Sequence, residues 1–159
     1  MIKELISPAV CAQCRMCCVF DIYDIWETPV FSRKMKEYIV SRKPDAEFIP
    51  KDGGYIFKAA DFSPDGTFKC PALTENGCML GDDKPFICRI FPYMVMEING
   101  ARAITAAVVC SEFYNRPLSE LVGFLKNGLA DRIFSYADIH PEEVRPYNEN
   151  YPILLIHNS

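Results

Sequence analysis

The feature that most constrains this chain is an eight-residue segment near its start that contains four cysteines. Thiolates at a spacing of three suit a soft metal ion, because a two-residue spacer lets one short backbone segment bring both sulfurs to one centre. Further cysteines follow, and the full set is Cys11, Cys14, Cys17, Cys18, Cys70, Cys78, Cys88 and Cys110. Eight thiols would fill two four-thiolate sites. We therefore predict a metal-binding protein with these eight residues as metal ligands.

A disulfide framework in a small secreted domain is the other common use of many cysteines. The ten residues before the first cysteine have no long apolar core and no small-residue cleavage site, which argues against export. Adjacent Cys17 and Cys18 also pair poorly with each other, since a disulfide needs side chains that converge. We expect a cytoplasmic protein whose cysteines are reduced and available to metal.

Composition predicts a single domain over residues 1–159. Half of the residues are hydrophobic and 24% are charged, both near average. No apolar run approaches the roughly 18 residues of a membrane span. A net charge of -4 disfavours a nucleic-acid surface, because phosphate binding relies on clustered Lys and Arg. We therefore predict neither a nucleic-acid nor a membrane partner, and interpret the basic run at 33–36 as the solvated face of a helix.

The pattern of elements predicts an α+β fold in which helices flank a small antiparallel sheet. Apolar residues at helical spacing predict a helix over 30–42, and residues 55–58 are typical of a strand. A second helix is expected over about 117–137, with Pro117 in its first turn. The proline-rich tail that follows is expected to be irregular.

A hairpin is predicted at Asn99-Gly100, because this pair favours the tight turn whose twist suits two antiparallel strands. The strands are expected at 93–98 and 101–109. Cys88 precedes the first strand and Cys110 follows the second. Antiparallel pairing would therefore return Cys110 to the neighbourhood of Cys88.

Two arrangements of the first cysteine segment are open. If residues 9–18 are helical, each residue turns about 100°, so Cys11, Cys14 and Cys18 share one face and Cys17 points elsewhere. If the segment wraps a cluster as in ferredoxins, Cys11, Cys14 and Cys17 bind and Cys18 is diverted. In either arrangement Cys17 and Cys18 are expected to serve different centres, or one of them reaches the second cysteine block.

The second cysteine block begins at Cys70 and contains features that favour thiolates. Gly77 permits a sharp turn that presents the next sulfur beside backbone amides, which can hydrogen-bond a thiolate. Arg89 beside Cys88 offers a positive charge that would favour its thiolate form, and Arg15 does so in the first block. The block therefore supports the prediction of thiolate ligands.

Together the two blocks resemble the CxxCxxCC zinc- or iron-chelating domain family, the YkgJ-type cysteine-cluster proteins. The matching positions are Cys11, Cys14, Cys17, Cys18, Cys70, Gly77, Cys78, Cys88, Arg89, Phe91 and Pro92. The resemblance covers roughly residues 9–110, and Cys110 belongs to it less firmly than the other cysteines. It implies metal or iron–sulfur binding and supplies no substrate.

Zinc and iron–sulfur clusters both accept four thiolates, so the ligand type does not separate them. The C-x2-C-x2-C start and the Cys70-Pro71 pair are similar to bacterial ferredoxin spacing. Histidine, common in mixed zinc sites, is limited to His140 and His157, and neither has a catalytic or metal-ligand context. The sequence favours a [4Fe-4S] cluster, with zinc as the alternative.

No catalytic constellation is legible, and there is no glycine-rich dinucleotide or phosphate loop. The main prediction is a metal or iron–sulfur protein for electron transfer, redox sensing or metal handling, with metal ions and a redox protein as its partners. A cluster-dependent oxidoreductase is one alternative. A structural zinc module that presents a surface to another protein is the other.

Overall fold

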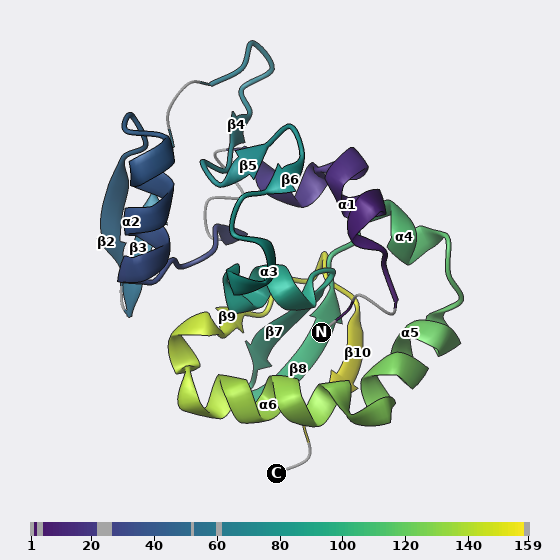
Figure 1. The fold of residues 1–159 in the computed structure, drawn as a ribbon. Coiled ribbons are helices and arrows are strands. Elements are labelled where there is room, and N and C mark those ends of the chain that lie inside the picture. The colour runs from purple at the N-terminus through teal and green to yellow at the C-terminus, as the bar shows by residue number, and fades with distance from the viewer. Residues whose placement is uncertain (1, 3–4, 22–26, 52, 60–61, 158–159) are drawn as a thin grey trace. The chain divides into compact units, whose positions relative to one another are not determined.

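The computed structural model describes residues 2, 5–21, 27–51, 53–59 and 62–157. Its contacts divide the chain into two compact units (Figure 1). The sheet unit comprises residues 1–6 and 89–159, and the cysteine unit comprises residues 7–88. Both contain helices and small sheets, which confirms a mixed α+β fold. That the whole chain forms one domain stays a prediction.

The sheet unit is built on a four-stranded sheet in the order β10-β8-β7-β9. Strands β7 (Tyr93–Ile98) and β8 (Ala101–Ala106) form the predicted antiparallel hairpin, although β8 is shorter than expected. Asn99 and Gly100 both have positive φ, at 51° and 82°. These are the signs that a type I′ turn requires, so the Asn-Gly signal is confirmed.

The tail after the last helix was predicted to be irregular. This prediction is wrong, because two segments of the tail join this sheet. Strand β9 (Arg145–Pro146) pairs in parallel with β7, and β10 (Ile153–Ile156) pairs antiparallel with β8. Pro146 is tolerated because it lies on an edge strand, where its missing N–H costs no ladder hydrogen bond. The two strands thereby pair with the edges of β7 and β8 that the hairpin leaves open.

The predicted continuous helix over 117–137 is wrong, because the structure divides it. Helix α5 (Leu118–Phe124) passes through an irregular segment, η4 (Leu125–Leu129), into α6 (Ala130–Ile139). Gly128 has a φ of 89° and Asn127 also leaves helical geometry. Glycine permits this left-handed conformation, which an α-helix cannot contain. The apolar stripe continues across the break, since Leu121, Leu125, Leu129 and Ile133 are all buried.

Short helices complete the sheet unit. They are α4 (Ser111–Tyr114) and the 3-10 helix η5 (Pro141–Glu143). Helix α6 runs across β7, β8 and β10 in Figure 1 and contacts β7. Tyr93, at the start of β7, donates a buried hydrogen bond from its hydroxyl to the Leu121 carbonyl at 2.9 Å, which ties α5 to the sheet.

The cysteine unit consists of short elements. It begins with α1 (Pro8–Cys14), the 3-10 helix η1 (Met16–Cys18) and β1 (Val19–Phe20). It continues with α2 (Arg33–Arg42), β2 (Phe48–Lys51), β3 (Gly54–Phe57) and β4 (Phe68–Lys69). It ends with β5 (Leu73–Thr74), β6 (Gly77–Cys78), the 3-10 helix η3 (Gly81–Asp83) and α3 (Phe86–Ile90), which crosses into the sheet unit. The three sheets here have two strands each, β1-β4, β2-β3 and β5-β6.

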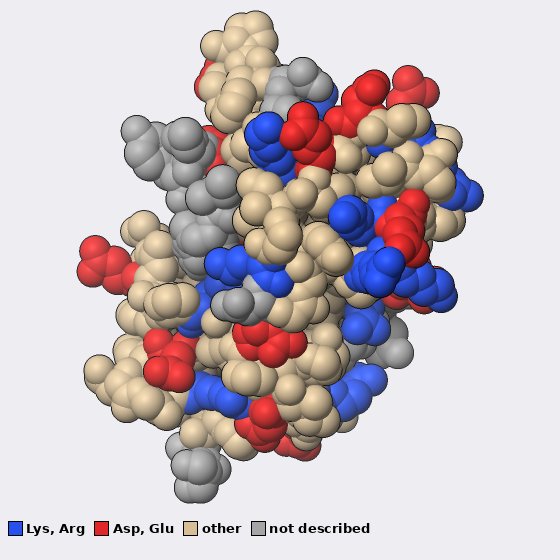
Figure 2. Space-filling model, turned by 90° about the vertical axis from the view of Figure 1, so that its left-hand side faces the viewer, with Lys and Arg blue, Asp and Glu red and all other residues tan. Residues whose placement is uncertain are grey.

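Helix α2 and strand β3 lie where the sequence predicted them. The helix begins after Ser32, whose hydroxyl accepts a hydrogen bond from the Met35 amide and so caps the N-terminus. Arg33, Lys34 and Glu37 are exposed on it. Lysine and arginine side chains lie among acidic ones on the face that carries α2 (Figure 2), which confirms that the basic run is a solvated helix face.

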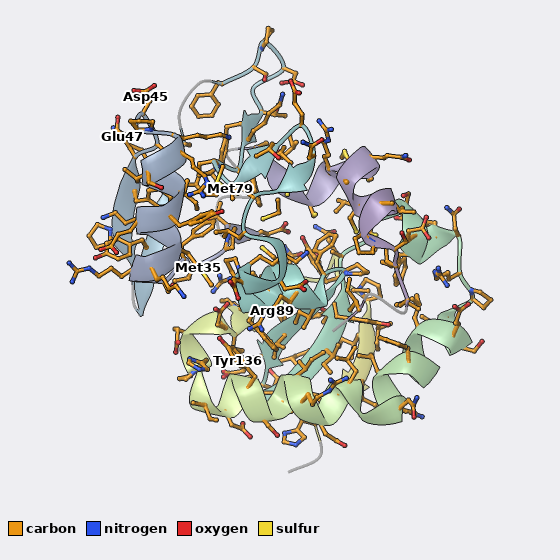
Figure 3. The ribbon with its side chains drawn as sticks, viewed as in Figure 1. Met35, Asp45, Glu47, Met79, Arg89 and Tyr136 are labelled. Carbon is orange, nitrogen blue, oxygen red and sulfur yellow. The ribbon has the colours of Figure 1, made fainter. Side chains whose placement is uncertain are left out.

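Aromatic rings form the core of the cysteine unit. Phe20, Phe57 and Phe68 contact one another with ring centroids 5.7 to 5.9 Å apart. Cys70 belongs to this buried cluster, and Cys18 and Cys78 pack against it. The side chains of Met35 and Met79, labelled in Figure 3, pack against the same cluster. The thiols of both cysteine blocks therefore border one apolar core.

No helix among the described residues is both long enough and apolar enough to cross a membrane.

Candidate metal centre

The backbone joins the two cysteine blocks directly. The Cys70 amide donates a hydrogen bond to the Cys18 carbonyl at 2.8 Å. The residue after Cys18 and the residue before Cys70 belong to the antiparallel β1–β4 ladder, in which Val19 pairs with Lys69. Residues far apart in sequence are thus held in register, and the two blocks meet at Cys18 and Cys70.

A tight hairpin then places Cys78 beside Cys70. The Leu73 amide donates to the Cys70 carbonyl at 3.0 Å, and Leu73 pairs with Cys78 across the β5–β6 ladder. Gly77 has a φ of 100°, which confirms the sharp turn predicted before Cys78. A β-carbon at Gly77 would meet the Ala12 β-carbon at 3.4 Å, so this turn also packs closely on helix α1.

Arg15 fastens the first cysteine block to this hairpin. It ends α1 in the left-handed conformation, with φ at 59°. Its Nε donates to the Ala12 carbonyl at 2.7 Å, and its Nη2 donates to the Glu75 carbonyl. The sequence suggested that this charge supports a thiolate, but the guanidinium makes its hydrogen bonds with two backbone carbonyls. We interpret Arg15 as a clamp between α1 and the β5–β6 turn.

We expect Arg15→Gln to lower the free energy of unfolding by about 2 kcal/mol, because charged hydrogen bonds contribute about 1.5–3 kcal/mol. Arg15→Gly should cost less, since glycine relieves a left-handed backbone that costs other residues about 1 kcal/mol. Urea unfolding measures both. Arg33→Gln serves as the control, because Arg33 forms only an exposed pair with Glu37. A loss at Arg15→Gln no larger than at Arg33→Gln would contradict the clamp.

Four thiols of the cysteine unit lie close enough to act on one another's ionisation. Burial raises the pKa of Cys70 to about 12, and the charges of Cys78 and Cys17 raise it further against opposing influences. Burial also raises the pKa of Cys88 well above its ordinary value, with Cys70, Cys17 and Cys78 adding to the effect. Cys17, Cys70, Cys78 and Cys88 are called the thiol cluster below.

Cys18 attaches to this cluster through its neighbour. A hydrogen bond between the Cys17 and Cys18 side chains is the largest cause that raises the pKa of Cys17, followed by burial. Helix α1 ends at Cys14 and η1 holds Cys17 and Cys18, so the continuous helix over residues 9–18 is wrong, whereas the arrangement that wraps a cluster stays a prediction. The hydrogen bond between the two sulfurs requires both side chains to turn toward each other.

The remaining cysteines lie in other surroundings. Cys11 is half-buried and Cys14 is exposed, both on α1. Cys110 belongs to the sheet unit, where it precedes α4 and its carbonyl accepts a hydrogen bond from the Phe113 amide at 3.0 Å. No disulfide joins any of the cysteines among the described residues. The histidines also lie in the sheet unit, where His140 stacks on Tyr136 and His157 on Phe134.

The thiol cluster has the donor chemistry of a soft-metal site but not yet its geometry. No three His, Cys, Asp or Glu side chains among the described residues are arranged to hold a metal ion. Burial is the main cause of the raised pKa values of Cys70 and Cys88, and the Cys18 hydrogen bond is the main cause at Cys17. Repulsion between neighbouring thiolates adds to the rise when no cation lies between them. A metal cation would remove this penalty, because bound thiolates share its charge. The cluster therefore fits a soft metal by composition and burial.

Two lysines face the cluster, and the sequence carried no signal for either. The charge of Lys43 lowers the pKa of Cys70, and that of Lys84 lowers those of Cys17 and Cys88. Lys43 follows α2, far from any cysteine in sequence. Arg89, which was expected to support Cys88, acts instead on Tyr136 and Glu143 of the sheet unit (Figure 3).

Comparison with known proteins gives no relative, because no family model, no curated protein and no solved structure matches this chain.

Proposed function

We propose that the cysteine unit binds a soft metal centre through the thiol cluster, Cys17, Cys70, Cys78 and Cys88. The observation that carries this proposal is that the charges of Cys17 and Cys78 raise the pKa values of both Cys70 and Cys88, which requires the four thiols to share one region. Four thiols beside an aromatic core are costly as thiolates without a cation. The other four cysteines stay predicted ligands of a second site.

An iron–sulfur cluster is the favoured occupant, with zinc as the alternative. Both are held by four cysteine thiolates. The ferredoxin-like spacing favours the cluster, and the apolar surroundings of Cys70 suit a redox centre that must be shielded from water. When bound, a cluster supplies reversible one-electron chemistry. The chain's residues would hold and shield it.

The biological role that fits such a centre is electron transfer, redox sensing or metal handling, with a redox protein as partner. This follows the resemblance to the CxxCxxCC family, which stays a prediction. An oxidoreductase and a structural zinc module stay as alternatives. Zinc has no redox chemistry, so a coloured and reducible centre would exclude the structural zinc module.

Anaerobic purification with metal analysis and absorption spectroscopy tests the proposal. An iron–sulfur cluster gives broad visible absorption that bleaches on reduction, whereas a zinc–thiolate site is colourless and does not change oxidation state. We expect Cys88→Ser to lose the centre, because a buried hydroxyl is a poor ligand for a soft metal. The control, Met16→Leu, changes an exposed sulfur-containing side chain that is not a predicted ligand and should keep it. Equal metal content in both variants would contradict the proposed ligands.

A further inference from the structure

Lys43 occupies an unusual position for a lysine. Its side chain is half-buried at the end of α2, and its Nζ donates a hydrogen bond to the Leu73 carbonyl at 2.7 Å. Leu73 is the residue whose amide binds the Cys70 carbonyl and which pairs with Cys78. The ammonium is therefore fixed to the backbone of the hairpin that holds two thiols of the cluster.

Within the described part of the chain, the Lys43 ammonium forms no ion pair with a carboxylate, unlike Arg33, which pairs with Glu37, and Lys58, which pairs with Glu47. A carbonyl offers a dipole and no negative charge. Withdrawing an ammonium from water is costly unless a charge compensates it. Asp45 and Glu75, the carboxylates nearest to it along the two segments, are exposed to water. The thiols of Cys70 and Cys78 belong to the hairpin that Lys43 binds and are buried or half-buried.

The net charge of a four-thiolate metal centre also favours a positive group beside it. Four thiolates around a divalent zinc ion, or around a [4Fe-4S] core of charge about +2, leave a net charge of about −2 in an apolar setting. The Lys43 ammonium is tied to Leu73, which binds the Cys70 carbonyl and pairs with Cys78. A positive charge is thus fixed on the hairpin of a centre that would carry about two negative charges.

We propose that Lys43 is a fixed counter-charge of the thiolate centre, held on the Leu73 carbonyl so that its ammonium offsets the negative charge of metal-bound sulfurs. The inference rests on the proposed function. It makes Lys43 a positioning residue whose effect is electrostatic. The charge of Lys43, more than its size or its hydrogen bond, should therefore determine how tightly the centre is held.

The test compares Lys43→Gln, which removes the charge but can still donate a hydrogen bond, with Lys43→Arg, which keeps the charge. Zinc affinity is measured by competition with a chromophoric chelator in the reduced full chain. We expect Lys43→Gln to bind zinc about tenfold more weakly than the parent, and the zinc affinity of Lys43→Arg to stay within about threefold of the parent's. These changes fit the loss of one partly screened charge. Lys34→Gln is the control, because it removes an exposed charge about 13 Å along the same helix.

If the native centre is an iron–sulfur cluster, its reduction potential gives a second readout. Loss of a nearby positive charge should make the potential of Lys43→Gln more negative, with Lys43→Arg unchanged. Should Lys43→Gln not fold, Lys43→Met offers a second neutral side chain with an apolar stem. Equal affinity in the neutral variant and the parent would overturn the counter-charge while leaving the proposed function intact. A parent chain that binds no metal overturns both.

Discussion

Removal of the metal is expected to loosen the segments of the cysteine unit around the thiol cluster, while its aromatic core and the sheet unit keep their structure. Structural zinc sites contribute about 10–16 kcal/mol to folding, more than the whole stability of many domains. Strands β1, β4, β5 and β6 of the cysteine unit have two residues each, so they provide few hydrogen bonds of their own. Hydrogen exchange before and after anaerobic chelation measures the effect in both units of the same chain.

The sheet unit is the internal control in that experiment. Its four-stranded sheet and the buried Tyr93–Leu121 hydrogen bond contain no cysteine, so amides of β7 and β8 should stay protected. Restoring the metal should restore protection over residues 7–88. Unchanged exchange and protease resistance of those residues after complete metal removal would mean that the aromatic core alone holds the cysteine unit.

Elements with a strong local signal could be predicted from the sequence. Asn99-Gly100 fixes its hairpin because both residues tolerate positive φ. Helix α2 has apolar residues at helical spacing and a serine cap. The break at Gly128 was missed because the apolar stripe runs through it without interruption, and that periodicity outweighed one glycine. The signal was present as the Asn127-Gly128 pair, which also favours a left-handed turn.

The grouping of the candidate ligands depends on contacts that leave no pattern in the sequence. Cys18 and Cys70 meet through one backbone hydrogen bond and a ladder of two residue pairs, too short to show alternation. Lys43 reaches the cysteines only because α2 ends beside the β5–β6 hairpin. The residue types of a thiolate site were therefore predictable, whereas the choice of four thiols and their charged neighbours required the fold.

Metal affinity is expected to rise steeply with pH and to keep rising past the ordinary range of a thiol. In the metal-free folded state, raised pKa values keep Cys17, Cys70 and Cys88 protonated, whereas ligands must be deprotonated. Metal binding therefore releases protons, and a higher pH favours the bound state. Each released proton changes the affinity about tenfold per pH unit, so three give about a thousandfold. Zinc competition between pH 6 and 9, with the chelator's own pH dependence subtracted, measures the slope.

The upper end of this window separates the thiol cluster from exposed cysteines. An unperturbed thiol has a pKa of about 8.5, so a site made of such thiols would gain little metal affinity above that pH. Burial raises the pKa of Cys70 to about 12, so its proton still competes with the metal at pH 9. Met16→Leu should leave the slope unchanged, because Met16 has no thiol that could release a proton. A slope that flattens above about pH 8.5, or fewer than two protons released per zinc ion, would show that the buried thiols are not the ligands.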